Sequence, residues 1–404
     1  MYIEREIEST VDAMLRQGKV VLVTGARQVG KTTMLRRHLG DSFAYATMDD
    51  ARDRALAKQD AALFFDSKTF PLIIDEVQRA PELFLPVKLL VDQSDERGRI
   101  VLTGSQTYHL MKGVSESLSG RIRTLQMPGL SLREILGKPA EPRAYRPSMV
   151  DAAACDVDSD LDIWSVIHRG SMPELQDPGI DWDSFYSDYV STYLERDVRE
   201  LVNVKDETRF YNFMVACAAR TGQLFNASEV AAAVGTDHKT AKSWLSVLQA
   251  SSIVRVVEPF WPNVDKRLTK MPKIFFMDTG LACHLTRWTT PEQLRNGAVA
   301  GHMFETFVVS EVLKSYMNVG ANLRDVWFYR DSKKREVDLV IQEGRVLHPV
   351  EVKTAATVGA DAVKNFGCLE KLSGYEVGFG HVICQTKEPY LVSRNVQAVP
   401  VWAI

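Results

Sequence analysis

The residues with the clearest chemical potential lie in one run near the start of the chain, which matches the pattern G-x-x-x-x-G-K-[ST] at every position. Glycines in such a run let the main chain bend so that its N–H groups surround phosphate oxygens at the N-terminus of a helix. Lys31 would then reach the β and γ phosphates of ATP, and the hydroxyl of Thr32 would bind the Mg²⁺ that bridges them. The expected nucleotide contacts are Gly25, Ala26, Arg27, Gln28, Val29, Gly30, Lys31, Thr32 and Thr33.

The elements that must position this loop lie on both sides of it. Residues 20–23 form a β-branched run typical of a strand, and residues 33–39 predict a helix. Residues 70–74 predict a buried strand that ends in two acids, Asp75 and Glu76, which is a Walker B pattern. We expect this strand beside the strand that precedes the loop, with Asp75 on the magnesium and Glu76 as the catalytic general base. Two solvated acids at a strand end are the alternative.

A third predicted strand, residues 99–102, ends in polar residues at the edge where ligands bind in open parallel sheets. Ser105 or Gln106 could sense the γ-phosphate or orient water there, and Gln106 joins the expected nucleotide contacts. A polar turn is the alternative. Arg121 follows a glycine and could act as a catalytic arginine finger, in its own subunit or in a neighbouring one, whereas an ordinary surface arginine is the alternative.

Four runs in the first third of the chain carry a family resemblance. TGARQVGKTT, IIDEVQRAPEL, VLTGSQ and ESLSGRI, in this order, resemble a widespread prokaryotic group of AAA-type P-loop ATPases. Members of that group carry a C-terminal domain of unknown function assigned to the PD-(D/E)XK nuclease-like superfamily. The resemblance runs from Ile3 to about Thr354. It implies that Lys31, Thr32, Asp75 and Glu76 match the nucleotide site of the family, and that Gln78, Gln106 and Arg121 match its further recurrent polar positions.

The C-terminal part of the chain carries a second group of acids. Glu305 lies near the start of a predicted helix, residues 301–316, and Asp338 lies in a predicted strand, residues 336–341. Glu351 and Lys353 share one face of the next strand, because side chains alternate along a strand. The resulting D-x12-E-x-K pattern suits metal-assisted phosphodiester hydrolysis.

In that interpretation Mg²⁺ or Mn²⁺ is held by Glu305, Asp338 and Glu351, and the catalytic residues are Asp338, Glu351 and Lys353. A charged strand face is the alternative. The family resemblance supports a nuclease-like fold without establishing nuclease activity, because domains of this superfamily often serve in binding alone. The nearby basic turn favours the approach of a polyanion, or is a solvated hairpin tip. It contains Arg330, Lys333, Lys334 and Arg335.

The middle of the chain predicts helices and a linker. Residues 137–160 are rich in proline and aspartate and indicate a linker, and residues 182–202 show the spacing of an amphipathic helix. Within that helix, residues 193–198 resemble a characteristic helix of the family, and its charged residues form a helix face more readily than a catalytic set. Residues 226–257 predict helix, glycine turn, helix and strand, which is the order of a winged helix-turn-helix.

The second of these two helices offers only His238, Lys239 and Lys242 as basic or titratable donors, which is a thin footprint for DNA phosphates. DNA contact and a packing role inside an ATPase both remain open for it.

The fold class expected is therefore α/β, an AAA-type P-loop NTPase with a parallel sheet, followed by a winged helix-turn-helix and a PD-(D/E)XK nuclease-like α/β domain. The predicted domains are the ATPase domain (1–138), a linker and helical lid (139–205), the winged helix (206–262) and the nuclease-like domain (263–404).

Composition narrows the class of protein but not its partners. The 404 residues are 45% hydrophobic and 25% charged, which excludes disordered, collagenous and coiled-coil chains. The chain has no apolar run of spanning length, and acids occupy residues 1–16, so we expect a cytoplasmic protein that spans no membrane. Five cysteines without a C-x-x-C pair suit reduced thiols. A net charge of −3 neither favours nor excludes nucleic acid.

The function expected is Mg²⁺-dependent ATP binding and hydrolysis coupled to a winged helix and a nuclease-like domain, acting on or near DNA. The alternative is an ATP-driven switch or scaffold whose nuclease-like domain is inactive and binds a protein partner. A P-loop kinase is a third interpretation, disfavoured by the size of the C-terminal half. DNA, another protein and a second copy of the chain are the partners that these interpretations allow.

Overall fold

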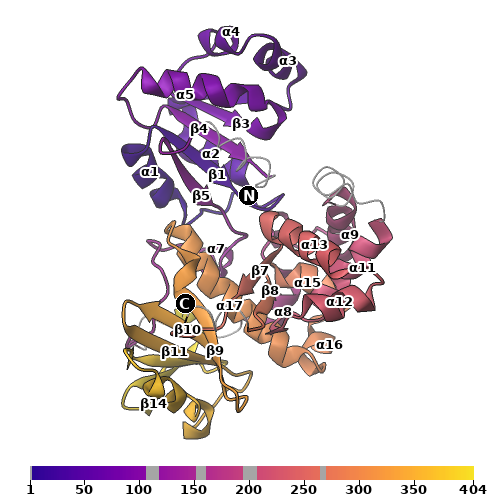
Figure 1. The fold of residues 1–404 in the computed structure, drawn as a ribbon, viewed down its shortest axis with the longest axis vertical. Helices are drawn as coiled ribbons and strands as arrows, with labels where there is room; N and C mark the ends of the chain where they lie inside the picture. Colours follow the sequence, from indigo (N-terminus) through magenta and orange to yellow (C-terminus); the bar gives the residue numbers. More distant parts are fainter. Residues whose placement is uncertain (1, 106–117, 152–160, 194–206, 264–269) are drawn as a thin grey trace.

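The computed structural model describes residues 2–105, 118–151, 161–193, 207–263 and 270–404, and its fold is drawn in Figure 1. The first part of the chain folds around a five-stranded sheet in the order β2-β3-β4-β1-β5, with every neighbouring pair parallel. Its strands are β1 (Val20–Thr24), β2 (Ala44–Thr47), β3 (Leu72–Asp75), β4 (Ile100–Gly104) and β5 (Ile122–Gln126). Its helices are α1 (Glu8–Gln17), α2 (Lys31–Leu39), α3 (Ala51–Gln59), α4 (Ala61–Asp66) and α5 (Phe84–Asp92).

This sheet is covered on both faces, as parallel sheets require. Every residue of β1 and β4 is buried. Successive side chains of β1 alternate between the two faces, so Val21 and Val23 join one hydrophobic cluster and Val20 and Leu22 join the other. The uninterrupted apolar runs that predicted these strands are therefore explained by burial on two sides.

The strand order corrects one prediction. We expected the strand that ends in Asp75 to lie beside the strand before the loop, but β4 lies between β3 and β1. Strand order depends on the crossover connections, and alternation or apolar content does not encode it. The carboxyl ends of β1, β3 and β4 still meet at one edge because all three strands are parallel.

The second part of the chain is mainly helical and contains a small antiparallel sheet in the order β6-β8-β7. Its strands are β6 (Gln223–Leu224), β7 (Val254–Val257) and β8 (Lys273–Phe276). The predicted boundary at residue 262 therefore divides one sheet, because β7 pairs with β8 across it. Its helices are α8 (Ile163–Arg169), α9 (Trp182–Tyr193), α11 (Glu207–Ala218), α12 (Ala227–Ala233), α13 (His238–Ala250), α15 (Thr279–Leu285) and α16 (Pro291–Asn296).

Side-chain caps explain where two of these helices begin. Asn226 accepts hydrogen bonds from the main-chain N–H groups of Ser228 and Glu229 at the start of α12. Asp237 does the same for α13. The predicted helix 182–202 is described as α9 up to Tyr193, and residues 194–206 lie outside the described part of the chain.

The third part consists of α17 (Ala300–Asn318) and a mixed seven-stranded sheet in the order β14-β15-β13-β11-β10-β9, with β12 paired to β11. Its strands are β9 (Val326–Arg330), β10 (Glu336–Glu343), β11 (Val346–Val352), β12 (Glu376–Val377), β13 (Gly380–Cys384), β14 (Tyr390–Ser393) and β15 (Val396–Pro400). Among the residues that the structure describes, no helix is long and apolar enough to cross a membrane.

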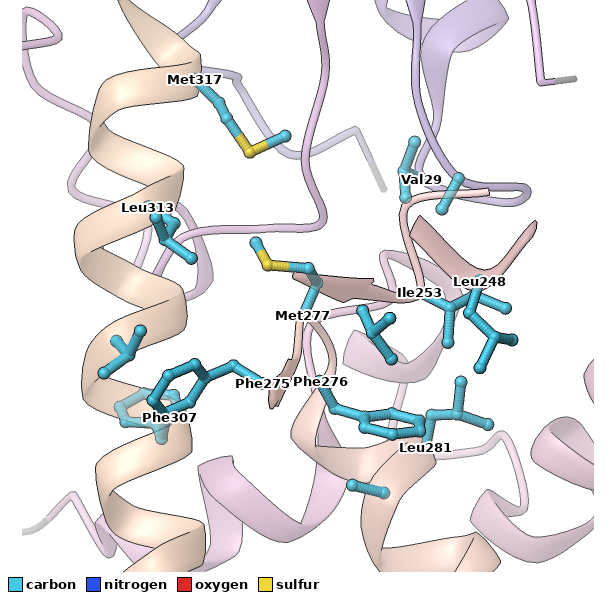
Figure 2. Close-up of a cluster of buried hydrophobic side chains, with 14 of the residues drawn as sticks. Val29, Leu248, Ile253, Phe275, Phe276, Met277, Leu281, Phe307, Leu313 and Met317 are labelled. Carbon is cyan, nitrogen blue, oxygen red and sulfur yellow. The ribbon is translucent and has the colours of Figure 1, made fainter. Parts of the chain in front are cut away.

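Helix α17 lies between the first part of the chain and the C-terminal sheet (Figure 1) and is buried along most of its length. Figure 2 shows its side chains facing β8 on one side of a hydrophobic cluster, while Val29 of the loop after β1 lies on the other side, near Ile253 and Leu248. That cluster includes Val29, Phe275, Met277, Phe307, Leu313 and Met317. A helix that is buried on all sides needs such partners all round, so α17 serves as a shared core element.

The predicted linker is partly fixed onto the C-terminal sheet. The hydroxyl of Tyr145 lies 2.7 Å from Nδ1 of His381, and Nε2 of the same ring lies 2.8 Å from the carbonyl oxygen of Ser148. The side chain of Gln397 pairs with both main-chain polar groups of Val150 at 2.9 Å. Residues 145–150 therefore run as a strap over this sheet.

This strap generates a pH prediction. Burial of His381 lowers its pKa from 6.5 to about 4, so between these values the unfolded chain binds a proton that the folded chain does not. The free energy of unfolding should therefore fall as pH falls through this range, by at most about 3 kcal/mol from this residue. Urea unfolding between pH 7 and pH 4 measures the loss.

The matched control is His381→Gln, which keeps polar atoms at this position and does not titrate. Its unfolding should depend less on pH over the same range, and equal slopes for the two proteins would contradict the assignment.

Candidate functional site

The loop between β1 and α2 has the geometry that its glycines predict. Gly25 has a φ of +149°, and a Cβ atom there would lie 2.2 Å from the carbonyl oxygen of Met127. Gly30 has a φ of +91° immediately before α2 begins. Any residue with a Cβ atom at position 25 would push the main chain of Met127 away. The loop can therefore follow this path only with glycine there.

Lys31 lies inside the loop that it follows. Its side chain is buried, and its ammonium donates to the carbonyl oxygens of Gly25 at 3.1 Å and Ala26 at 2.7 Å. The ammonium thus closes the loop on itself. It lies where a phosphate oxygen entering the loop would meet it.

The hydroxyl of Thr32 contacts the carboxylate of Asp75 across the carboxyl edge of the sheet. The Thr32 oxygen donates to both Asp75 oxygens, at 3.1 and 2.9 Å. Tyr45 also donates to Asp75, at 2.8 Å, and burial together with this carboxylate raises the pKa of the Tyr45 hydroxyl to about 12. A hydroxyl and a carboxylate this close are the oxygen ligands that Mg²⁺ prefers, so Thr32 and Asp75 fit the expected ion.

Glu76 adopts a left-handed main-chain conformation, with a φ of +53°, which turns the chain sharply after β3. Burial raises the pKa of its carboxyl above the usual value, the charge of Asp75 adds to this, and Lys31 opposes it. Its side chain contacts the amide of Gln78. A carboxylate with a raised pKa is a better proton acceptor, as a general base requires.

A cavity of about 350 Å³ opens at this edge. Its lining residues are Arg27, Gln28, Gly30, Lys31, Thr32, Thr33, Glu76, Ser105, Tyr189 and Thr192. The hydroxyl of Ser105 is buried without a hydrogen-bond partner in the described structure, which is consistent with a polar group meant for a ligand. Gln106, the other residue predicted here, lies outside the described residues.

Sequence reasoning missed Tyr189 and Thr192. Both belong to α9, in the second part of the chain, and they line the cavity opposite the loop. Tyrosine and threonine on a helix carry no motif, and contacts between distant segments are not encoded in local spacing. The cavity is therefore built by two parts of the chain.

Arg121 lies away from the cavity of its own chain. It precedes β5, whose first residue pairs with Val20 at the amino end of β1, whereas the loop leaves the carboxyl end of β1. A strand of five residues separates these ends by about 16 Å. Its guanidinium instead pairs with Asp92, with Nη2 at 3.0 Å from Oδ2. Arg121 therefore does not lie at the cavity of its own chain, and action on a neighbouring subunit and an ordinary surface role are the two interpretations that stay predictions.

The predicted C-terminal acids come together around a lysine that was not predicted. Lys273 of β8 is almost fully buried, and its ammonium lies 2.7 Å from Glu305 of α17 and 2.6 Å from Glu336 of β10. These carboxylates and that of Asp338 raise the pKa of the Lys273 ammonium and outweigh the effect of burial. The buried Lys273 ammonium thus neutralises part of the negative charge of this cluster of carboxylates.

The E-x-K strand has the predicted facing. Lys353 Nζ lies 2.6 Å from Glu351 Oε1, so the two side chains share a face, while the other oxygen of Glu351 is buried without a hydrogen-bond partner in the described structure. Asp338 accepts from the main-chain N–H of Val352 at 2.8 Å. Burial raises the pKa values of Glu305 to about 8 and of Glu351 to about 7, and the charge of Asp338 contributes to both.

The fit of a metal ion here is partial. Asp338 and the orphan oxygen of Glu351 offer oxygen ligands, whereas Glu305 is already bonded to Lys273. In the described part of the chain, no three His, Cys, Asp or Glu side chains form a group suited to a metal ion. The sequence predicted the strands that carry Asp338 and Glu351, but it has no signal for Lys273. That lysine lies 32 residues before Glu305 in the chain, in β8 of the small antiparallel sheet.

Three family models match successive parts of the chain. Residues 17–136 match the model of an AAA domain. The N-terminal part of the chain therefore resembles AAA domains. Residues 161–292 match a domain of unknown function, DUF8612, and residues 300–404 match another, DUF4143. Neither description assigns an activity, and the family of the AAA part implies nucleotide binding.

Similar whole proteins add no activity. The uncharacterized proteins Rv2008c of Mycobacterium tuberculosis and Mb2031c of Mycobacterium bovis are each 28% identical over 361 residues, covering 88% of this chain and 75% of theirs. The Walker-type ATPase PABY2304 of Pyrococcus abyssi aligns with 70% of this chain and 96% of its own at 14% identity and a TM-score of 0.44. The RuvB branch migration motor of Thermotoga maritima aligns with 63% and 89% at 16% identity and a TM-score of 0.29. These scores are too low to carry an argument.

The close approach at Gly25 gives a prediction for the loop. Gly25→Ala places a methyl group against the carbonyl oxygen of Met127, so the loop must move and the domain should lose more than about 1 kcal/mol of stability. Urea unfolding measures this change.

The control is Gly301→Ala, where a methyl group meets nothing within 4 Å and lies in α17. That substitution should stabilise the helix by up to about 1 kcal/mol. An unchanged unfolding midpoint for Gly25→Ala would show that the loop does not depend on this contact.

Proposed function

We propose that this protein is a Mg²⁺-dependent ATPase whose nucleotide binds between the loop after β1 and helix α9. The observation that carries the proposal is the contact of the Thr32 hydroxyl with both oxygens of Asp75, beside a loop closed by Lys31. This arrangement supplies phosphate donors and oxygen ligands at one edge of the sheet. Glu76 lines the same cavity with the raised pKa expected of a general base.

The roles of the residues follow from their positions. Main-chain N–H groups of the loop bind phosphate oxygens, and Lys31 exchanges its bonds to Gly25 and Ala26 for bonds to phosphate. Thr32 and Asp75 would hold Mg²⁺, which would supply positive charge against the phosphates. Glu76 orients and deprotonates the attacking water, and the Ser105 hydroxyl lies in the same cavity to donate to phosphate or water.

The second part of the chain would respond to the nucleotide. Tyr189 and Thr192 line the cavity from α9, so filling the cavity changes what this helix contacts. We infer that ATP binding and release reposition the second part against the first. We also propose that the protein is cytoplasmic, as the sequence suggests.

Action on or near DNA is the proposed use of that movement. The order α11, β6, α12, α13, β7, β8 is that of a winged helix, which supports this fold for residues 207–276. The exposed face of α13 carries His238, Lys239 and Lys242. Two lysines and a histidine would give weak, salt-sensitive phosphate binding at most.

One observation favours the second candidate, a switch or scaffold whose C-terminal domain binds a protein partner and does not cut DNA. The Lys273 ammonium pairs with the carboxylates of Glu305 and Glu336. Of the acids predicted to bind a metal ion, only Asp338 and Glu351 are then left. A nuclease of the proposed type needs its carboxylates free to hold the ion. The C-terminal domain, in this candidate, keeps a nuclease-like fold stabilised by an internal cation.

The ATPase proposal predicts specific losses. Lys31→Ala should abolish ATP binding, because the ammonium that meets the phosphates is removed. Glu76→Gln should retain binding and lower the hydrolysis rate by about 10²-fold or more, because only the base is lost. Phosphate release and binding of a fluorescent ATP analogue, each with and without Mg²⁺, measure the two effects.

Arg97→Ala, in an exposed part of the same domain, is the control and should behave as the wild type. An equal loss of binding in Glu76→Gln, or unaltered hydrolysis in either variant, would overturn the assignment.

The second candidate predicts how the protein responds to metal ions. Lys273→Met leaves buried carboxylates without their cation, so it should cost about 3–5 kcal/mol of stability. Millimolar Mn²⁺ should restore part of this loss by binding the Glu305 and Glu336 carboxylates in place of the ammonium, and it should leave wild-type stability unchanged. Thermal unfolding with and without Mn²⁺ measures the difference.

The control is Lys314→Met, which breaks the equally buried pair of Lys314 with Glu311 and leaves a single acid. That variant should be destabilised and not rescued by Mn²⁺. Plasmid nicking by the wild type with Mg²⁺ or Mn²⁺, lost in Asp338→Asn, would contradict the switch and support the nuclease.

A further inference from the structure

Arg5 lies before α1, outside the residues that match the AAA model, yet its guanidinium contacts the loop after β1. It is 3% exposed, and its Nη1 donates to the carbonyl oxygen of Val29 at 2.8 Å. A Cβ atom built on Gly30 would lie 4.0 Å from the same nitrogen. The guanidinium therefore lies directly against the end of the loop.

This contact has a consequence for the phosphate donors. The peptide that joins Val29 to Gly30 is planar and trans, so its carbonyl and its N–H point in opposite directions. Holding the Val29 oxygen on the guanidinium aims the Gly30 N–H to the other side. Gly30 lines the cavity together with Lys31, so that other side is where a phosphate would bind.

The guanidinium is itself fixed from several directions. Nη2 donates to the carbonyl oxygens of Pro128 at 2.8 Å and Gly129 at 3.2 Å, just after β5. Nε lies 3.0 Å from the buried carboxylate of Glu134, which makes an ion pair whose angle does not meet that of a hydrogen bond. Glu134 in turn accepts main-chain hydrogen bonds from Glu6 at 2.7 Å and Ser131 at 2.9 Å.

A planar guanidinium suits this position better than an ammonium would. Its donors form a rigid fork, so one group can bond to the loop and to the segment after β5 while its charge pairs with an acid. Breaking a buried ion pair on one side is costly, whereas removing both charges is often neutral. A variant that removes both charges can therefore show whether Arg5 aims the loop, without the large loss of stability that an unpaired buried charge would cause.

We propose that Arg5 is a positioning residue for the phosphate-binding loop, which it holds by the Val29 carbonyl so that the Gly30 N–H faces the phosphates. The inference rests on the proposed binding of ATP at this loop. It adds a residue, outside the AAA match, on which nucleotide affinity depends.

The test uses the full-length chain with Arg5→Lys, Arg5→Met and the double variant Arg5→Met, Glu134→Gln. The double variant removes both charges, so it should be destabilised less than Arg5→Met, in which Glu134 stays buried without its cation, while it still lacks the bond to Val29. Its dissociation constant for a fluorescent ATP analogue should rise about tenfold or more, and Arg5→Lys should recover part of that affinity because it can restore one donor.

A second measurement needs no nucleotide. Hydrogen exchange of the amides in residues 25–31 should be faster in the double variant than in the wild type, because the loop has lost its anchor. This readout separates the two claims. If the wild type binds no ATP while exchange still quickens, the proposed function fails and the positioning of the loop by Arg5 stands.

Arg169→Met is the matched control. Its guanidinium also bonds to main-chain carbonyl oxygens, those of Leu175, Asp177 and Ile180, none of which belongs to the loop. It should leave exchange of residues 25–31 and ATP affinity unchanged. Wild-type affinity and wild-type exchange in a folded double variant would overturn the proposal and reduce Arg5 to a structural ion pair.

Discussion

The hydrogen bonds between Thr32 and Asp75 depend on the parallel direction of the strands β1, β4 and β3. Their strands β1 and β3 are separated by β4, which puts them about 10 Å apart. The residues meet only because all three strands end at the same edge and because the loop and the first turn of α2 extend over the end of β4. An antiparallel pairing anywhere among these strands would send one of the two groups to the opposite edge.

Helix α17 then ties this edge to the rest of the chain. Glu311 accepts from the main-chain N–H of Leu132 at 2.8 Å, and Lys314 donates to the carbonyl oxygen of Leu130 at 2.8 Å, beside the segment that holds Arg5. The same helix carries Glu305 to Lys273 at its other end. This helix of 19 residues therefore joins the segment after β5, which holds Arg5, to the acidic group around Lys273.

Local patterns predicted local structure well. The loop with Lys31, the caps of α12 and α13, and the shared face of Glu351 and Lys353 all follow from rules that act over a few residues. The sequence could not predict the place of β4 between β1 and β3, because strand order depends on crossovers. It also could not predict the contacts that join distant segments.

Those contacts are made by residues whose types carry no motif. Tyr189 lines the cavity beside the loop from α9, and Lys273 enters the acidic group from β8. Arg5 reaches the loop from 24 residues away. Spacing along the chain left the place of Arg121 open, and the structure puts it a full strand length from the loop of its own chain.

The account stands on a nucleotide that binds between two parts of the chain, and hydrogen exchange of the wild-type protein with and without ATP and Mg²⁺ tests this most directly. We predict slower exchange in residues 25–33 and also in α9, residues 182–193, when ATP is bound. Protection of the loop alone would contradict the claim that α9 completes the site, and no protection in either segment would contradict nucleotide binding at this edge.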